Sequence, residues 1–240
     1  MRKCLNFKVV GFACAVAVAM PLWLSASSNK DDDIARLRAA TAVFQQVMAT
    51  PDNAIPDEIL SHASCIAIIP GEKKAAFGVG GNYGKGIAMC RNAANTAWNP
   101  PLFVTIGGGS WGFQLGVQSS DIIMVFGDRS QLDSLLSSKF RVGAEAAAAA
   151  GPVGRHVAAG TDVKLNSQIL TYGRSKGAFA GISISGAVVQ PDTTGNQAMY
   201  GENTNDEKIL SGSGVAMPAA AKPLVALLKA HPATAPKSGS

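Results

Sequence analysis

The side chains best suited to chemistry in this chain of 240 residues are Lys and Arg residues in or beside glycine-containing turns. Such turns expose backbone N–H groups, and a nearby cation adds positive charge, so together they can bind a phosphate or another anion. We predict that Arg155, Arg174 and Lys176 share an anion site. Further candidates with the same pattern are Lys139, Arg141, Lys73, Lys74 and Lys85.

Two enzyme-like patterns overlap around Ser110, and we expect neither to mark an enzyme. Residues 108–112 read G-x-S-x-G. A nucleophile elbow needs a helix directly after the serine and then an acid and a histidine along the chain. Asp128 or Asp133 followed by His156 would give that order, but the residues after Ser110 alternate like a strand. The overlapping G-x-G-x-x-G lacks the same helix, which a dinucleotide site requires. A serine hydrolase is therefore a weak alternative.

The cysteines suggest a disulfide, and the histidines suggest no metal site. Cys65 and Cys90 are the cysteines that remain once an N-terminal leader is removed. An oxidising compartment allows them to form a disulfide, and otherwise both would be small buried residues. The three histidines lie far apart in the sequence, without the spacing of a metal motif. We therefore predict neither a metal nor another cofactor.

The N-terminus is typical of a secretory signal peptide. A basic start is followed by the uncharged apolar run Val9–Leu24 and then by small residues, which places cleavage near Ala26 to Ser28. Pro21 interrupts the apolar run, which is also short for a membrane anchor. Cys14 lacks the leucine of a lipid-attachment box. The sequence therefore predicts a periplasmic or secreted protein.

The charge balance argues against a nucleic-acid partner. Without the leader, 18 basic and 16 acidic side chains leave a net charge of +2. Domains that bind nucleic acids are usually much more basic. Residues 64–190 hold eleven basic and six acidic side chains, so the positive charge belongs to the glycine-rich part of the chain.

Apolar periodicity predicts helices at the beginning of the mature chain. Residues of Ile34–Met48 recur at helical spacing, and a short helix follows from about Ile55 to His62. The first helix could lie on a membrane, but interfacial helices are usually more basic. We therefore expect it to pack on a sheet.

Strand patterns fill the middle of the chain, and helical periodicity returns near its end. We expect a hairpin around residues 82–84, a strand ended by the glycines at 107–109, and a helix at 219–229. The other expected strands are 65–69, 111–118, 121–126, 145–150, 163–170 and 179–189, with a short helix at 130–136.

These patterns predict an α+β fold. It would be a strongly bent antiparallel sheet or a partial β-barrel, with N-terminal and C-terminal helices packed on it. The predicted divisions are a signal peptide at 1–27, one domain at 28–214, and a C-terminal helix with a disordered tail at 215–240. Within the domain, residues 28–63 are a helical start, 64–190 a β-rich core and 191–214 a polar connection.

The chain resembles the SYLF-domain family from about Ile34 to Gly212. The motifs that carry the resemblance are FGVGGNYGKG (77–86), the block from 100 to 126, AAGPVGR (149–155) and YGRSKGAFAGISISG (172–186). The resemblance implies binding of acidic phospholipid head groups, phosphoinositides in eukaryotic members, and no enzymatic activity. Some eukaryotic members also bind actin, a role that we do not expect of a secreted bacterial member.

We therefore expect binding of anionic phospholipid or phosphoinositide head groups through the basic surface lined by glycine turns. Trp111 would contact the acyl chains. The alternative is a structural or protein-interaction module of the periplasm that has a protein partner in the envelope and no lipid ligand.

Overall fold

The computed structural model describes residues 30–49, 54–127, 140–141, 147–153, 168–175, 178–182 and 187–233. Side chains are described for these residues except 76–79, 109–117, 140–141, 147–149 and 168.

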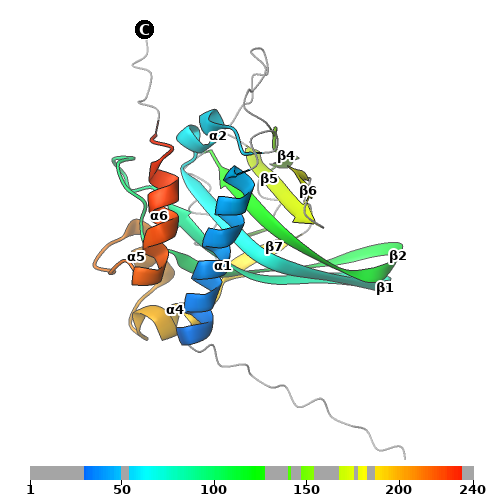
Figure 1. The fold of residues 1–240 in the computed structure, drawn as a ribbon. Helices are drawn as coiled ribbons and strands as arrows, with labels where there is room; N and C mark the ends of the chain where they lie inside the picture. Colours follow the sequence, from blue (N-terminus) through cyan, green and yellow to red (C-terminus); the bar gives the residue numbers. More distant parts are fainter. Residues whose placement is uncertain are drawn as a thin grey trace, which may run out of the picture.

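The fold is α+β, as predicted: an open, mainly antiparallel sheet of seven strands with helices from both ends of the chain (Figure 1). The helices are α1 (Lys30–Met48), α2 (Asp57–His62), α4 (Thr193–Tyr200), α5 (Asp206–Ser211), the 3₁₀ helix η1 (Ala219–Ala221) and α6 (Lys222–Lys229). The strands are β1 (Cys65–Cys90), β2 (Leu102–Phe126), β3 (Phe140–Arg141), β4 (Ala147–Ala150), β5 (Gln168–Ser175), β6 (Ala178–Gly181) and β7 (Val188–Pro191).

Two long strands form the frame of the sheet. β1 and β2 pair antiparallel along nearly their whole lengths, from Cys65 opposite Phe126 to Ala88 opposite Leu102. The other edge of β2 pairs with β7 near its start and with β5 near its end. β3 joins β7, β6 joins β5, and β4 runs parallel to β5. Figure 1 shows the middle of the β1–β2 pair extending away from the helices as an arm.

The predicted hairpin around residues 82–84 is wrong. Asn82 and Gly84 lie inside β1, opposite Gly108 and Ile106 of β2. The glycines at 107–109 likewise continue β2 rather than ending it. Glycine-rich sequence was interpreted as turns, but here it lies in strands whose backbones come close together.

β1 folds back so that its first half meets its second half. A Cβ added to Gly86 would lie 2.3 Å from the backbone oxygen of Ile68, and one on Gly84 would lie 2.6 Å from Ile69 Cγ2. The Asn82 side-chain amide donates a hydrogen bond to a Glu72 carboxylate oxygen at 2.8 Å. Any side chain at residue 86 would push the two halves apart, so the bend depends on glycine.

A disulfide closes this fold of β1. Cys65 and Cys90, the first and last residues of the strand, are joined with an S–S distance of 2.13 Å. The Arg91 backbone N–H also donates to the Ser64 carbonyl at 2.8 Å, directly beyond the disulfide. Backbone pairing and the covalent bond therefore hold the same two ends together.

The part of the sheet near the helices is buried on both faces. Ile66 and Ile68 pack into one core with the apolar stripe of α1, whose Leu37 and Phe44 are fully buried. Ala67 and Ile69 point the other way, into a second core that α5 completes with Ile209 and Leu210. Burial on both faces explains why these strands read as continuous apolar runs. The predicted packing of the first helix on the sheet is confirmed.

Helices α4 and α5 correct the predicted polar connection at 191–214. Asp192 caps α4 by accepting a hydrogen bond from the Gly195 N–H, and Asn205 caps α5 by accepting one from the Lys208 N–H. Gly212 ends α5 in the left-handed region, with φ of 73°. The helix predicted at 219–229 is confirmed as η1 and α6.

The remaining strand predictions are partly right. The alanine run at 145–150 is a strand over Ala147–Ala150. Of the strand predicted at 163–170, residues 168–170 lie in β5, which continues to Ser175, and residues 163–167 lie outside the described residues. The strand predicted at 179–189 is divided between β6 and β7. The predicted helix at 130–136 and the signal peptide lie outside the described residues.

Candidate functional site

Arg174 is held by an acidic partner on the neighbouring strand. Its guanidinium forms a salt bridge with Asp121 of β2 at 2.8 Å and donates through Nε to the same oxygen at 2.9 Å. It also donates to the Gln46 side chain of α1. Asp121 accepts a further hydrogen bond from the Gly71 N–H. Much of the Arg174 charge is therefore neutralised within the fold.

Lys85 belongs to a second charged cluster, at the start of α1. Its ammonium lies 3.4 Å from Asp192, which also binds Arg36 at 3.0 Å. Arg36 lies 3.1 Å from Asp33 and places its guanidinium over the Phe103 ring, 5.2 Å from the centroid. This cluster fixes α1 to β1 and to the beginning of α4.

The electrostatics of this cluster favour the ionised form of Asp192. Burial alone would raise the pKa of its carboxyl group. The hydrogen bonds from the Gly195 N–H and from Arg36, together with the charges of Arg36 and Lys85, outweigh burial and hold the pKa of Asp192 below its ordinary value. Asp192 therefore stays charged and neutralises cations that sequence reasoning had left free.

Lys73 and Lys74 lie on opposite faces of the β1–β2 pair, because successive side chains in a strand alternate. Lys73 is exposed and donates to the Ser119 hydroxyl at 3.0 Å, on the same face as Asp121 and Arg174. Lys74 is partly exposed and lies opposite Gln118. Lys73 and Lys74 therefore do not belong to one cluster.

The rest of the predicted site is not placed by the structure. Arg155, Lys176 and Lys139 lie outside the described residues. Arg141 is in β3 and Trp111 is in β2 opposite Val79, but neither side chain is described. The shared site of Arg155, Arg174 and Lys176 therefore stays a prediction, as does the acyl contact of Trp111.

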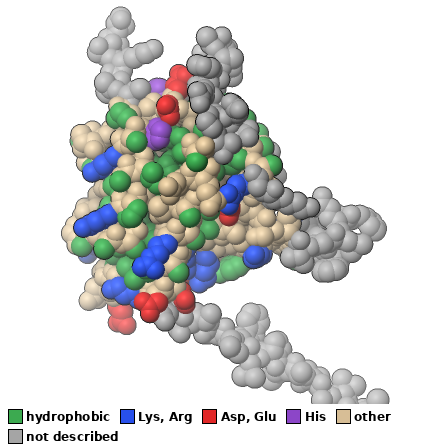
Figure 2. Space-filling view, in the orientation of Figure 1, with side chains coloured by type: hydrophobic (Ala, Val, Ile, Leu, Met, Phe, Trp, Pro, Cys, Tyr) green, Lys and Arg blue, Asp and Glu red, His purple; other side chains and the backbone are tan. Residues whose placement is uncertain are grey.

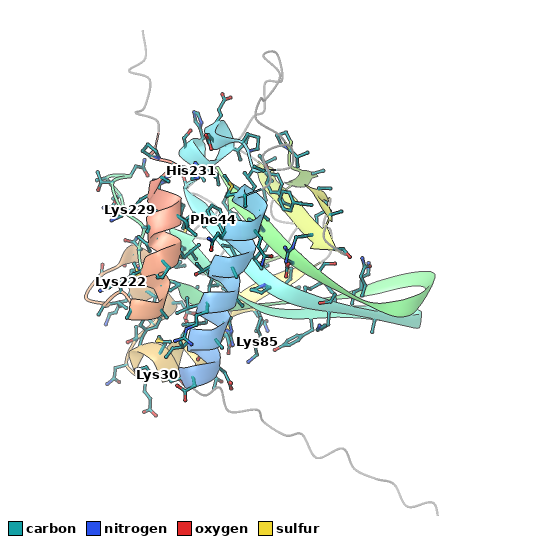
Figure 3. All side chains as sticks on the ribbon, viewed as in Figure 1. Lys30, Phe44, Lys85, Lys222, Lys229 and His231 are labelled. Atoms are coloured by element: carbon teal, nitrogen blue, oxygen red, sulfur yellow. A yellow bond between two sulfur atoms is a disulfide. The ribbon has the colours of Figure 1, made fainter. Side chains whose placement is uncertain are left out.

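Exposed cations gather where α1 and α6 lie side by side. Figure 2 shows Lys and Arg side chains spread over this face, with acidic side chains mainly toward its ends. Figure 3 places Lys30 at the start of α1, Lys222 and Lys229 on α6, and Lys85 beside α1. α1 also exposes Arg38. We call this surface the helical face and define it by the exposed cations Lys30, Arg38, Lys222 and Lys229.

Most cations of the helical face are available to an external anion. Among the described residues, no carboxylate lies within salt-bridge distance of Lys30, Lys222 or Lys229, and all three side chains are exposed. Tyr83, two residues before Lys85 on β1, is 53% exposed and lies on the same face of that strand as Lys85. Sequence reasoning missed Lys222 and Lys229, although their spacing of seven residues puts both on one side of a helix.

A pocket opens beside Lys30. It has a volume of about 560 Å³ and lies between the start of α1, the end of α4 and residues 214–220. Ile34, Met199, Val215 and Met217 supply apolar side chains to its wall. Lys30 is the charged residue among those that line it.

A second hollow surrounds the C-terminal end of α2. Arg91 donates to the carbonyl oxygens of Ala63 at 3.0 Å, of Leu60 at 3.3 Å and of His231 at 2.8 Å. Its guanidinium stacks on Trp98, 4.5 Å from the ring centroid, and burial lowers its pKa. These contacts make Arg91 a structural clamp on backbone carbonyls.

The described residues were also compared with the requirements of a metal site and of a membrane-spanning helix. In the described part of the chain, no group of three or more His, Cys, Asp or Glu side chains could hold a metal ion. None of the described helices is long and apolar enough to cross a membrane.

Comparison with known proteins identifies relatives over most of the chain. Residues 107–231 match the family Ysc84, described as "Las17-binding protein actin regulator". Protein YSC84 of Saccharomyces cerevisiae is 31% identical over 183 residues, which are 75% of this chain and 38% of that protein. The SH3 domain-containing protein PJ696.02 of Schizosaccharomyces pombe is 30% identical over 72% of this chain and 40% of its own length. The SH3 domain-containing YSC84-like protein 1 of Bos taurus is 30% identical over 74% of this chain and 52% of its own length. The chain thus spans about half, or less, of these relatives.

Proposed function

Since this chain belongs to the Ysc84 family of Las17-binding actin regulators, we propose that it is a non-enzymatic module that binds membranes of anionic phospholipid or phosphoinositide. The expectation of lipid comes from the SYLF resemblance of the sequence, and the helical face supplies a surface for it. In this proposal the protein is a secreted bacterial member that acts in the periplasm, or outside the cell, after its leader is removed.

The observation that carries this proposal is the set of exposed lysines on the helical face. Lys30, Lys222 and Lys229 have no carboxylate within salt-bridge distance among the described residues, whereas Lys85 and Arg174 are paired. The exposed side of α6 between its two lysines is apolar, with Pro223 and Ala226. Positive charge beside exposed apolar surface suits an anionic bilayer, where each Lys near the surface contributes about 1 kcal/mol.

Co-sedimentation with vesicles tests this assignment. The mature chain is mixed with vesicles of neutral phosphatidylcholine, and with vesicles that also contain phosphatidylglycerol or a phosphoinositide, at low and at high salt. We expect binding to the anionic vesicles alone, and its loss in high salt because salt screens exposed charges. Replacing both α6 lysines, Lys222→Gln and Lys229→Gln, should weaken binding about 30-fold.

Lys74 provides the matched control. It is partly exposed but points away from the α1 side of the sheet. Lys74→Gln should therefore leave vesicle binding unchanged, while Lys222→Gln alone should weaken it about fivefold. Equal effects of the two variants would reject the helical face, and binding lost only on changing Arg155, Arg174 and Lys176 would favour the site predicted from sequence.

Protein binding is the second candidate, and the names of the relatives favour it. The family description names Las17, and two of the relatives are named as SH3 domain-containing proteins. The chain spans about half, or less, of those proteins, so their partners do not transfer with the domain. Absence of binding to every vesicle, with a protein partner recovered from envelope extract, would favour this candidate.

A further inference from the structure

The pocket beside Lys30 has the dimensions and the walls of a site for an apolar ligand. Its volume of about 560 Å³ falls within the range of about 300–1,000 Å³ that small-molecule sites occupy. Ile34, Met199, Val215 and Met217 line it and are only partly buried, although all are apolar. A ligand that covered these side chains would remove apolar surface from water.

The tyrosine in the wall of the pocket offers ring surface, because its hydroxyl is already hydrogen-bonded within the protein. The Tyr200 hydroxyl donates to the Pro101 carbonyl oxygen at 2.5 Å, so this residue presents its ring rather than a free hydroxyl. Burial, with a smaller effect from Asp33, raises the pKa of Tyr200 far above its ordinary value and keeps it uncharged. Met199 and Met217 are flexible, so the wall can adapt to the shape of a ligand.

One cation lies at the rim of the pocket. Lys30 is exposed, no acidic side chain lines the pocket, and Thr204 adds a hydroxyl. A mainly apolar wall with one cation at its rim complements a ligand that has a hydrocarbon chain and one anionic end.

We propose that this pocket binds one fatty acid, with the hydrocarbon chain among Ile34, Met199 and Met217 and the carboxylate beside Lys30. The inference rests on the proposed lipid function and goes beyond it: a lipid chain enters the protein, whereas the helical face meets only the membrane surface.

Titration calorimetry of the mature chain with octanoate, decanoate, dodecanoate, tetradecanoate and hexadecanoate, each below its micelle concentration, tests this. Each added methylene that is buried should raise affinity about fourfold. The gain should stop once the pocket is full, because further methylenes would stay in water. Lys30→Gln should lower the affinity for every acid about threefold and leave the dependence of affinity on chain length unchanged.

Two variants separate the pocket from the membrane surface. Ala216→Phe places a ring at the exposed rim of the pocket, where the fold can accommodate it. This variant should lower the affinity for the longer acids more than tenfold. Met217→Phe is a second filling variant for the case that the first one fails to fold. Lys222→Gln, outside the pocket lining, should weaken vesicle binding and leave fatty-acid affinity unchanged.

The outcomes distinguish this inference from the proposed function. Absence of fatty-acid binding with vesicle binding intact would overturn the pocket alone. Affinity that rises through hexadecanoate and is indifferent to Ala216→Phe and Met217→Phe would also overturn it, because it would indicate partition onto the surface. Fatty-acid binding that levels off, without vesicle binding, would support the pocket and reject the membrane surface.

Discussion

Single residues decide how much of the positive charge in this protein is free. Arg174 and Lys85 are attractive anion ligands in the sequence, yet Asp121 and Asp192 lie beside them. Lys30, Lys222 and Lys229 drew no attention in the sequence but are exposed without such partners among the described residues. A sequence shows which cations exist, whereas their acidic partners come from distant parts of the chain.

The dependence of protein stability on acid pH tests how much the charge of Asp192 contributes to the fold. The pKa of Asp192 is lower in the folded protein than its ordinary 3.8, so its charged form stabilises the fold above that pH. This stability is lost as the pH falls below about 3.8 and through the folded pKa. Asp192→Asn keeps the helix cap but removes the charge, and should cost about 2 kcal/mol at neutral pH.

Urea unfolding of wild type and Asp192→Asn across this pH range measures the difference. The gap in unfolding free energy should narrow as the pH falls below 3.8. Burial raises the pKa of Asp206, which acts in the opposite direction but is present in both proteins and cancels in the comparison. A gap that stays constant down to low pH would mean that the Asp192 charge does not contribute.

At the scale of elements, the continuity of β1 through residues 82–84 is the feature that sequence patterns did not reveal. Sequence patterning correctly located the helices at 34–48 and 219–229, and the short helix expected from about Ile55 is α2, which begins at Asp57; apolar residues of all three face one core. The same patterning divided β1 at residues 82–84, where glycines occur. Glycine marks turns and close backbone approach alike, and only the distant contact with Ile68 distinguishes them here. The helices α4 and α5 were missed because they are short and largely polar.

Gly86→Ala tests whether the bend requires glycine. The new Cβ would lie 2.3 Å from the Ile68 oxygen and 2.8 Å from the Ile69 Cα, both backbone atoms. We expect a loss of about 3 kcal/mol in unfolding free energy, measured with urea. Gly81→Ala is the matched control in the same strand, since its Cβ would meet nothing closer than the Gly108 oxygen at 3.6 Å. Similar stability of the two variants would argue against close packing of the two halves of β1.

For the whole molecule, the arrangement of two cores around one sheet implies cooperative unfolding. Strand residues alternate between the cores, with Ile68 in one and Ile69 in the other, so neither core can open without disturbing the strand. The α+β class and the helices packed on a bent sheet were predictable from sequence. The division into two cores was not, because fully apolar strands do not show which face each side chain takes.

Phe44→Ala and Leu210→Ala test this coupling, one in each core. Phe44 is fully buried in α1, where Figure 3 marks it, and Leu210 is buried in α5. Each substitution should cost about 3 kcal/mol. Tryptophan fluorescence and circular dichroism should report the same urea midpoint in each variant. Separate midpoints for the two signals would show that the cores unfold independently.

The disulfide between Cys65 and Cys90 turns β1 into a covalent ring. A protease that cut the arm once, anywhere between these cysteines, would open this ring without releasing a fragment. The nicked protein would keep its full mass under non-reducing conditions and would separate into two pieces only after treatment with a thiol. The most extended part of the molecule could therefore be cleaved while the chain on either side of the cut stays joined.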